Sequence, residues 1–447
     1  MRNAAARALT LTAVTLATVL VSAQAPSPAP RRVEGPAPRR VEGPDPRVQL
    51  RQGVKRSELD AQAQKTYDFV VNPTNPHRDG LPAPIGMWMW SQRLGDRILP
   101  IYMYLRFGTQ LDVRTKELAI LIAARYNNST TQWGTHGRNA RNVGVEQRVL
   151  DVIRDGAPLT GLSDKDAVAI QLGREMFGDK RVGSETFARA VKIFGPKGVT
   201  DLAGLMAFYE FLYISSNVAF DLESGGNFPK LPPHATPKRA AAAVPAAMPA
   251  DINAESRARL PFVKRVDLDA DGKKTYDAIV NPTSRYSRGL PAPIGMWMHS
   301  PEMAQYVLPA YMYVRFGTQL GTRLTELAIL VTARETDCQF QWTSHEPMAR
   351  DAGLEPALID TVKYRKDPSG LSEKDALVIR FGHELFAEHH VSAATFTHAQ
   401  RVFGTRGVTD LAGLMAFYEF LYLSSNATFD IQMPAGQKPL LPEQANQ

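Results

Sequence analysis

Two stretches of this 447-residue chain place a carboxylate and an imidazole at the same spacing. His136 follows Glu117 by nineteen residues, and His345 follows Glu326 by nineteen residues. A carboxylate beside an imidazole orients the ring and favours its protonated form. If a helical turn brings each pair together, the histidine becomes a usable general acid or base. We therefore take these four residues as the candidate catalytic residues.

The residues before each histidine repeat as well. Gln132 and Trp133 stand four and three residues before His136. On a helix these spacings place all three side chains on one face. The second stretch has the same arrangement in Gln341 and Trp342. The tryptophan would supply a flat apolar wall beside the imidazole.

A purely structural role is also open for each pair. Glu117 lies three residues after Arg114, and Glu326 lies three residues after Arg323. This spacing forms ion pairs on the surface of a helix. His136 would then only cap a helix or hydrogen-bond within a bundle. Because structural ion pairs also perturb pKa values, spacing alone leaves both interpretations open.

The sequence does not favour a metal centre. One histidine and one glutamate per stretch make a thin ligand set, and neither HxH nor HExxH occurs. His383, His389 and His390 fall close together, but the equivalent positions of the first stretch hold arginine and lysine. We expect these three histidines at the surface, and we expect no cofactor.

Both stretches belong to an internal repeat of a whole domain. GLPAPIGMWM occurs at 80–89 and again at 289–298, an offset of 209 residues. With the same offset, 194–221 matches 403–430 at 23 of 28 positions. The predicted organisation is a signal peptide at 1–25, a Pro/Arg-rich linker at 26–56, a first domain at 57–225, an Ala/Pro-rich linker at 226–265, a second domain at 266–434 and a tail at 435–447.

Each copy has the sequence pattern of a helical bundle. The apolar spacing of 57–71 predicts a helix, and 113–127 is a strong helix former with an apolar middle that should be buried. Ser163 is placed to cap another helix. Further helices are expected from Ser184 to near Gly195 and over 199–220. No alternating strand pattern occurs, so we predict an all-α fold of two tandem helical bundle domains.

The N-terminus has the features of a secretory signal peptide. Arg2 and Arg7 precede a short apolar stretch at 8–21, and Ala23–Ala25 forms an A-x-A cleavage site. This stretch is short for a bilayer span, although an uncleaved anchor is the alternative. We predict export to the periplasm or the medium after cleavage near Ala25, and no stable membrane anchor.

Composition and charge exclude other classes of protein. Hydrophobic residues make up 44% of the chain and charged residues 22%, as in ordinary globular proteins. The net charge of +7 is carried by the first 56 residues, so we expect no nucleic-acid partner. The basic segment within 26–56 is either an extended linker or an arm that touches an anionic envelope. The single cysteine, Cys338, excludes an intramolecular disulfide and a cysteine-rich zinc site.

Two longer stretches resemble a known superfamily. LPIYMYLRFGTQLDVRTKELAILIAARYNNSTTQWGTHGRNARNVGV looks like the core of carboxymuconolactone decarboxylase-like proteins, which include the AhpD-type alkylhydroperoxidases. HSPEMAQYVLPAYMYVRFGTQLGTRLTELAILVTARETDCQFQWTSHEPMARDAGL is closer still. The family pattern is an RxxELaIL helix, an EW dipeptide, a histidine and a Gly-terminated helix. The resemblance spans most of both copies and implies an all-α bundle that assembles into a homo-oligomer.

The chain departs from the redox branch of that family. This branch carries two cysteines between the glutamate and the histidine, where the first copy has Ser129 and Gln132 and the second has Cys338 and Gln341. A dithiol peroxidase needs an attacking thiolate and a resolving partner, so an AhpD-like peroxide-reducing activity is the less favoured alternative. The glutamines also replace the glutamate of the EW dipeptide, which removes a carboxylate.

The remaining features resemble the decarboxylase-like branch. The resemblance implies a cofactor-free lyase for a small cyclic or aromatic carboxylic acid or lactone. His136 and His345 would deliver a proton to carbon, oriented by the glutamates and flanked by the tryptophans. Arg125 and Arg334 would meet the substrate carboxylate, or else lie at the surface of a helix C-terminus. A non-catalytic binding or assembly protein is the third possibility.

Overall fold

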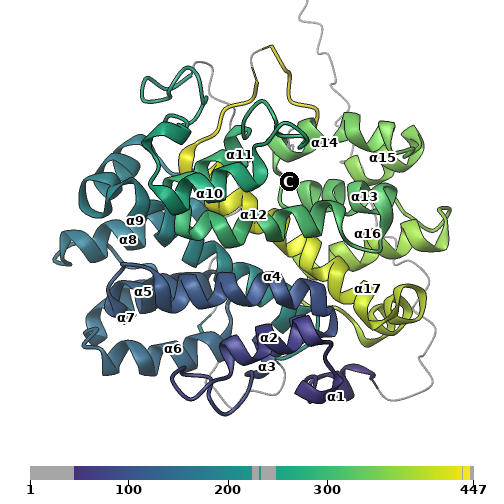
Figure 1. Ribbon diagram of the computed structural model, residues 1–447, viewed down its shortest axis with the longest axis horizontal. Helices are drawn as coiled ribbons and strands as arrows, with labels where there is room; N and C mark the ends of the chain where they lie inside the picture. The colour runs from purple at the N-terminus through teal and green to yellow at the C-terminus, as the bar shows by residue number, and fades with distance from the viewer. Residues whose placement is uncertain (1–44, 224–230, 233–247, 435, 443–447) are drawn as a thin grey trace, which may run out of the picture. The chain divides into compact units, whose positions relative to one another are not determined.

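Helices account for all the regular secondary structure in the described part of the chain, which confirms the predicted all-α class (Figure 1). The computed structural model describes residues 45–223, 231–232, 248–434 and 436–442. Up to residue 223 the α-helices are α1 (Arg47–Leu50), α2 (Ala61–Val70), α3 (Ala83–Gly86), α4 (Gln92–Met103), α5 (Val113–Tyr126), α6 (Thr130–Asn142), α7 (Gln147–Asp155), α8 (Asp164–Arg174) and α9 (Ser184–Leu212).

The second copy repeats this series without α1. Its α-helices are α10 (Ala270–Ile279), α11 (Ala292–Gly295), α12 (Pro301–Phe316), α13 (Gly321–Glu335), α14 (Gln339–Asp351), α15 (Pro356–Lys363), α16 (Glu373–Phe386) and α17 (Ala393–Leu421). Short π-helical segments extend α4, α8, α9 and α17, at Tyr104–Gly108, Glu175–Asp179, Tyr213–Val218 and Tyr422–Ala427.

Polar side chains begin the helices that position the candidate residues. Asp112 accepts a hydrogen bond from the backbone N–H of Thr115 at the start of α5 (2.8 Å). Ser129 accepts one from Gln132 at the start of α6 (3.2 Å), and Ser163 caps α8 in the same way, as predicted. Each cap satisfies an N–H group that has no partner within its helix.

The long helices α9 and α17 are bent at equivalent glycines. Gly195 has φ 69° and Gly404 has φ 71°, in the left-handed region that glycine adopts without strain. The break near Gly195 was expected from the sequence. Beyond each bend the helix is buried on nearly every face, because α5 and α8 pack on α9, and α13 and α16 pack on α17.

The two halves of the described chain pack closely on one another. Helix α4 contacts α12, and α9 contacts α17. A Cβ atom on Gly204 would lie 2.6 Å from the sulfur of Met303, and one on Gly413 would lie 2.6 Å from Leu94 Cδ2. Each glycine therefore admits a buried side chain from the opposite half. All described residues fall in one compact unit, so the two predicted domain limits stay a prediction.

Segments expected to be linkers or a tail contribute to this packing. Arg47, from the expected 26–56 linker, is 2% exposed and donates to the carbonyl of Val391 (2.6 Å). Arg259, from the 226–265 linker, is 7% exposed and pairs with Asp430 (3.1 Å). The expectation of an extended linker therefore fails at Arg47, and Arg259 is packed as well, because composition does not reveal partners that lie far along the chain.

The expected tail also contacts the second half, at Leu440 and Leu441. The backbone of Leu441 accepts from the side-chain amide of Gln339 (2.7 Å) and donates to it (3.0 Å). The predicted signal peptide at 1–25 and the rest of the first linker up to residue 44 lie outside the described residues. In the ranges that the structure describes, no helix is both long and apolar enough to span a bilayer.

Candidate functional site

Each candidate glutamate contacts its histidine. Glu117 Oε2 lies 2.8 Å from His136 Nδ1, between α5 and α6, and Glu326 Oε2 lies 2.9 Å from His345 Nδ1, between α13 and α14. An ionised carboxylate only accepts, so it selects the tautomer in which Nδ1 carries the hydrogen. Nε2 then holds the lone pair, and no residue in the described ranges hydrogen-bonds it. Nε2 is therefore the atom that can exchange a proton with a bound molecule.

An arginine holds the other oxygen of each glutamate. Arg106 Nη2 contacts Glu117 Oε1, and Arg315 Nη2 contacts Glu326 Oε1. Although burial raises the pKa of each glutamate, the adjacent histidine and arginine together hold it below its usual value. Both carboxylates therefore stay ionised at neutral pH.

The ion pairs considered as an alternative do not form. Arg114 pairs with Asp166 (2.7 Å) instead of the glutamate three residues after it, and Arg323 pairs with Asp375 (2.7 Å). These aspartates lie in the first turns of α8 and α16, which pack against α5 and α13. The arginines turn toward these neighbouring helices, and the glutamates are left to the histidines.

A tyrosine covers one side of each imidazole. The ring of Tyr209 meets that of His136 edge to face, with centroids 5.2 Å apart and planes at 90°. Tyr418 meets His345 in the same way, at 5.3 Å and 83°. Burial raises the pKa of both tyrosines well above its ordinary value, so both stay neutral.

The surroundings of the two sites differ farther out. In the first half Tyr102 shares a hydrogen bond of 2.8 Å with His77 Nε2. At the equivalent place the second half has Tyr311, which accepts from the hydroxyl of Tyr286 (3.0 Å). The repeated Glu–His pairs therefore lie beside polar groups that are not identical.

Burial lowers the pKa of His136 and His345 below the usual value for histidine. The glutamate acts in the opposite direction, whereas the charge of the adjacent arginine lowers the histidine pKa further. The glutamate therefore does favour the protonated ring, as expected, but burial outweighs this effect in the resting site. Both rings are still 13% and 12% exposed, so solvent can reach them.

One donor of the second site is uncommitted. Arg315 is 5% exposed at its side chain, and its Nη1 has no hydrogen-bond partner among the described residues. An unpaired N–H group of a buried guanidinium is costly unless an anion or a polar group meets it. This atom lies on the same side chain that holds Glu326, the partner of His345.

Each predicted glutamine connects two helices and forms no hydrogen bond to the histidine among the described residues. Gln132 Nε2 donates to the carbonyl of Tyr209 (3.4 Å), and Gln341 Nε2 donates to the carbonyl of Tyr418 (2.6 Å). Both side chains are buried. They therefore attach the histidine-bearing helix of each half to the long helix that carries the tyrosine.

The tryptophans differ between the halves. Trp133 is half-buried and packs against the core. Trp342 is fully buried, and its Nε1–H donates to Glu346 (2.6 Å), which also pairs with Arg350 and Lys363. The expected wall is therefore not available in the second half without movement.

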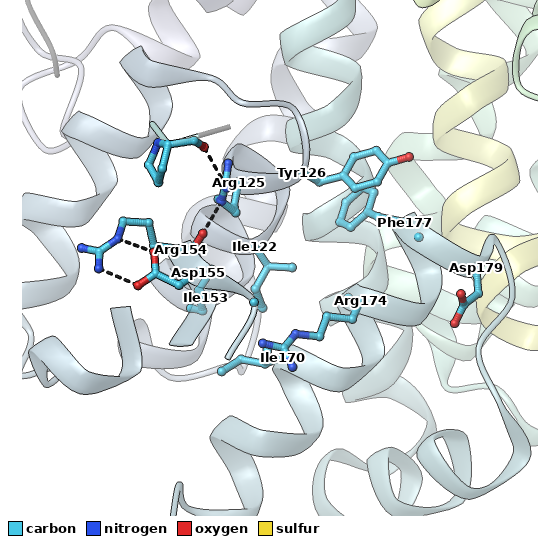
Figure 2. A pocket seen from close by; sticks show the side chains of 14 residues that line it. Ile122, Arg125, Tyr126, Ile153, Arg154, Asp155, Ile170, Arg174, Phe177 and Asp179 are labelled. Carbon is cyan, nitrogen blue, oxygen red and sulfur yellow. Dashed lines mark hydrogen bonds and ion pairs between the residues drawn. The ribbon is translucent and has the colours of Figure 1, made fainter. Parts of the chain in front are cut away.

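Arg125 and Arg334 lie at the opposite end of their helices from the glutamates. Eight residues along a helix span about 12 Å. The guanidinium of Arg125 donates to the carbonyls of Arg154 (2.5 Å) and Pro232 (3.0 Å), beside a separate pocket (Figure 2). Arg334 pairs with Asp337 (2.6 Å). The structure does not bring these arginines to the histidines.

The lone cysteine is inaccessible. Cys338 Sγ accepts from the backbone of Gln341 (3.5 Å) at the start of α14, and burial raises the pKa of the thiol far above its usual value.

His383 is half-exposed and lies 3.4 Å from Glu335. In the part of the chain that the structure describes, no three histidine, cysteine or acidic side chains are grouped to hold a metal ion.

Four residues of the sites were not anticipated, namely Arg106, Tyr209, Arg315 and Tyr418. Each belongs to a string shared by both copies, RFGTQ for the arginines and AFYEFLY for the tyrosines. The copies share so many residues that this identity did not single out any of them. Their proximity to the histidines depends on how helices pack, which the sequence pattern does not give.

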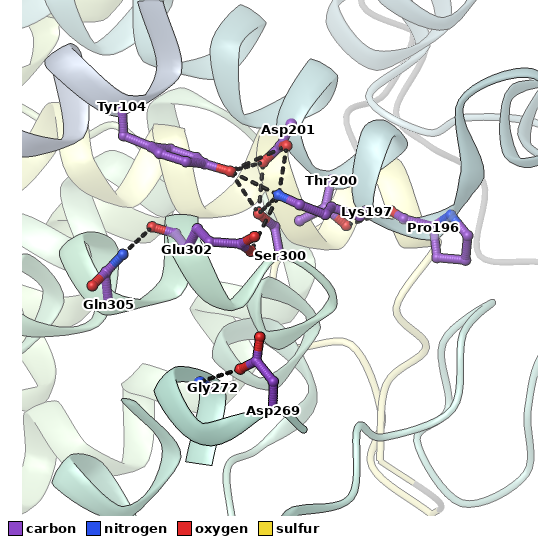
Figure 3. Close-up of polar contacts among 10 residues, drawn as sticks. All are labelled: Tyr104, Pro196, Lys197, Thr200, Asp201, Asp269, Gly272, Ser300, Glu302 and Gln305. Carbon is purple, nitrogen blue, oxygen red and sulfur yellow. Dashed lines mark hydrogen bonds and ion pairs between the residues drawn. The ribbon is translucent and has the colours of Figure 1, made fainter. Parts of the chain in front are cut away.

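A second pair of buried polar clusters joins the halves. Asp201, on α9, accepts from Ser300 of the other half (2.7 Å), from Tyr104 (3.1 Å) and from Lys197 (3.2 Å), as Figure 3 shows. Burial raises the pKa of Asp201, although these donors act in the opposite direction. The cluster shares no residue with the Glu–His sites.

No family model matches the chain, and no curated protein and no solved structure matches it. The grounds for a function are therefore the repeated Glu–His geometry and the resemblance in sequence.

Proposed function

We propose that each half carries a cofactor-free acid–base site of the lyase type, acting on a small cyclic or aromatic carboxylic acid or lactone. The observation that carries this proposal is the repeated arrangement of His136 and His345. In both, Nδ1 is bound to a buried glutamate at 2.8 and 2.9 Å, and Nε2 is uncommitted. Such a pair orients an imidazole for proton transfer at Nε2.

The proposed reaction is loss of carbon dioxide followed by protonation. The C–C bond to the substrate carboxylate breaks, and its electron pair remains on the substrate as a dienolate. Nε2 of His136 or His345, having taken a proton from solvent, delivers it to carbon and forms the new C–H bond. The ionised glutamate stabilises the transient imidazolium, and the ring returns to its neutral form.

The arginine beside each glutamate supports an anionic substrate. Arg315 Nη1 is buried without a partner among the described residues and can donate to a carboxylate or to the developing dienolate oxygen. The ring of Tyr418 packs against the imidazole of His345 and closes that side of the site. Arg106 occupies the equivalent place in the first half.

The lowered histidine pKa gives the proposal a definite pH dependence. Proton delivery needs the imidazolium, so the rate should rise as pH falls below about 6.5 toward the histidine pKa and then level off. A reaction in which the neutral ring first removes a proton would instead become slower as pH falls through the histidine pKa.

A thermal-shift screen of carboxylated lactones and aromatic acids tests the proposal, because ligand binding raises the melting temperature by mass action. The His136→Ala/His345→Ala variant is compared with wild type, and His383→Ala/His398→Ala serves as a control at exposed histidines. We expect an acid that stabilises wild type and the control but not the first variant, and that then releases carbon dioxide. An equal shift in all three proteins would contradict the proposed sites.

Two other expectations are part of the proposal and rest on sequence. We propose that the chain is exported after cleavage near Ala25, and that it forms a homo-oligomer, as the resemblance implies. The peroxide-reducing alternative gains no support, since Cys338 is buried and its pKa is raised. If no acid binds, a non-catalytic binding or assembly role is the better explanation.

A further inference from the structure

A pocket of about 570 Å³ opens in the first half, at the opposite end of α5 from Glu117 (Figure 2). This volume is within the range of small-molecule sites, about 300–1,000 Å³. Helices α5, α7 and α8 form it. Its apolar side consists of Ile122, Ile153, Ile170 and Phe177.

Arg174 is the distinctive polar residue of this pocket. Its Nη2 donates to the carbonyls of Val152 (3.1 Å) and Ala157 (2.8 Å), which fixes the guanidinium in place. No carboxylate pairs with it within the described ranges, and Figure 2 shows the guanidinium directed toward Ile170. Burial without a counter-charge lowers the pKa of Arg174. A half-buried, positioned cation of this kind favours an anionic ligand.

The other two arginines of the pocket already have hydrogen-bond partners, and its remaining acid would repel a second anionic group. Arg125 donates to backbone carbonyls, and Arg154 forms two hydrogen bonds to Asp155 (2.8 and 2.7 Å). Asp179 also lines the pocket, and no described residue forms an ion pair with it. One available cation and an acid at the rim suit a ligand with a single carboxylate.

The second half neutralises the same place internally. Its residues equivalent to Tyr126, Gly156 and Arg174 are Glu335, Arg365 and His383. Glu335 lies 3.4 Å from His383 and 3.8 Å from Arg365. The charges there satisfy one another, so the unpaired cation is a property of the first half alone.

We propose that this pocket binds a small monocarboxylate with an apolar body. The carboxylate meets Arg174, and the body lies against the isoleucines and Phe177. The site is separate from the Glu–His pairs and does not depend on their proposed reaction.

Isothermal titration calorimetry with phenylbutyrate tests the proposal, with the neutral phenylbutyramide and the dicarboxylate phenylsuccinate as comparison ligands. We expect wild type to bind phenylbutyrate best of the three. Arg174→Gln should weaken phenylbutyrate binding by about tenfold or more, because it removes a charged hydrogen-bond donor. Amide binding should not change, and His383→Gln, at the equivalent position, should bind as wild type does.

A second variant fills the pocket with the residues of the other half. Gly156 has φ 68°, and Arg365 occupies the equivalent position with φ 48°, so this turn accepts an arginine. Tyr126→Glu/Gly156→Arg should therefore fold and lose phenylbutyrate binding. His136→Ala/His345→Ala should retain it, which separates this site from the proposed catalytic sites. Absence of binding to wild type, equal binding of acid and amide, or loss of binding in the histidine variant would each overturn the proposal.

Discussion

The hydroxyl of Ser300 donates a 2.7 Å hydrogen bond to the buried carboxylate of Asp201, across the boundary between the two halves. The reciprocal contact runs from Ser91 to Asp410 at 2.6 Å. Ser300 is the equivalent of Ser91 and Asp410 is the equivalent of Asp201, so each copy gives its serine to the aspartate of the other, which is the pattern of an isologous interface. The halves therefore pack as the two subunits of a symmetric dimer do, although one chain supplies both.

Replacing Asp201 should weaken this interface. Asp201→Ala removes the carboxylate that accepts from the hydroxyls of Ser300 and Tyr104, and we expect a loss of about 2–4 kcal/mol in the free energy of unfolding. Urea denaturation followed by circular dichroism measures it. Asp79→Ala, at a side chain that is 93% exposed, is the control and should change stability by less than about 0.5 kcal/mol. Equal midpoints for the two variants would show that the cross-half contact contributes nothing.

The close approach at Gly204 gives a second prediction. Gly204→Leu places a side chain where Met303 already packs, and overpacking of this kind costs about 1–3 kcal/mol. Adding Met303→Ala should restore part of the loss, because it frees the same space. Denaturation of the two single variants and the double variant forms a cycle. Strictly additive effects would contradict a direct clash between the halves.

The sequence was sufficient for several of the helices, and it offered the pairing of Glu117 with His136 as one of two interpretations. Apolar periodicity and capping residues act locally, so α5, the Ser163 cap and the break at Gly195 were predictable. The nineteen-residue spacing also places one glutamate and one histidine on consecutive helices. These features depend on short stretches of chain that can be read independently of the rest.

Contacts between distant segments were not predictable in the same way. Arg106 and Tyr209 reach the first site only because the π-helical segment Tyr104–Gly108 and helix α5 both pack against α9. The docking of Arg47 beside Val391 joins positions 344 residues apart. The lowered pKa of His136 was not predictable for a related reason, since burial by distant segments outweighs the adjacent carboxylate.

Stability should depend on pH through the two site histidines. Their pKa is lowered in the folded state, so between that pKa and the ordinary 6.5 the unfolded chain binds more protons. Their contribution is fully present above about pH 6.5 and is lost as pH falls through the folded pKa. His136→Gln/His345→Gln should flatten this part of the profile in urea titrations between pH 5 and 8. A steeper decline in the variant would contradict the predicted sign.

The arginine beside each glutamate should tune the histidine. Arg315→Met removes a positive charge that lowers the pKa of His345, so we expect this pKa to rise. Titration of the imidazole signals by NMR measures the change. His136, in the other half, should titrate as in wild type and serves as the internal control. A lower or unchanged pKa for His345 would show that Arg315 does not act on it electrostatically.

Cys338 should be inert in the folded protein. Its thiol is buried and its pKa is raised, so a thiol-specific disulfide reagent should react only after denaturation. Cys338→Ser should leave any peroxide consumption unchanged. Rapid labelling of the native protein, or a fall in peroxide consumption in the variant, would instead support a redox role.

The isologous packing of two covalently joined copies changes how such a site can diversify. In a dimer of identical chains every substitution occurs twice, once in each subunit. Here Tyr126, Gly156 and Arg174 differ from their counterparts Glu335, Arg365 and His383, while the Glu–His pairs stay alike. Joining the halves in one chain therefore lets them differ at this pocket while the Glu–His pairs and the shared interface are preserved.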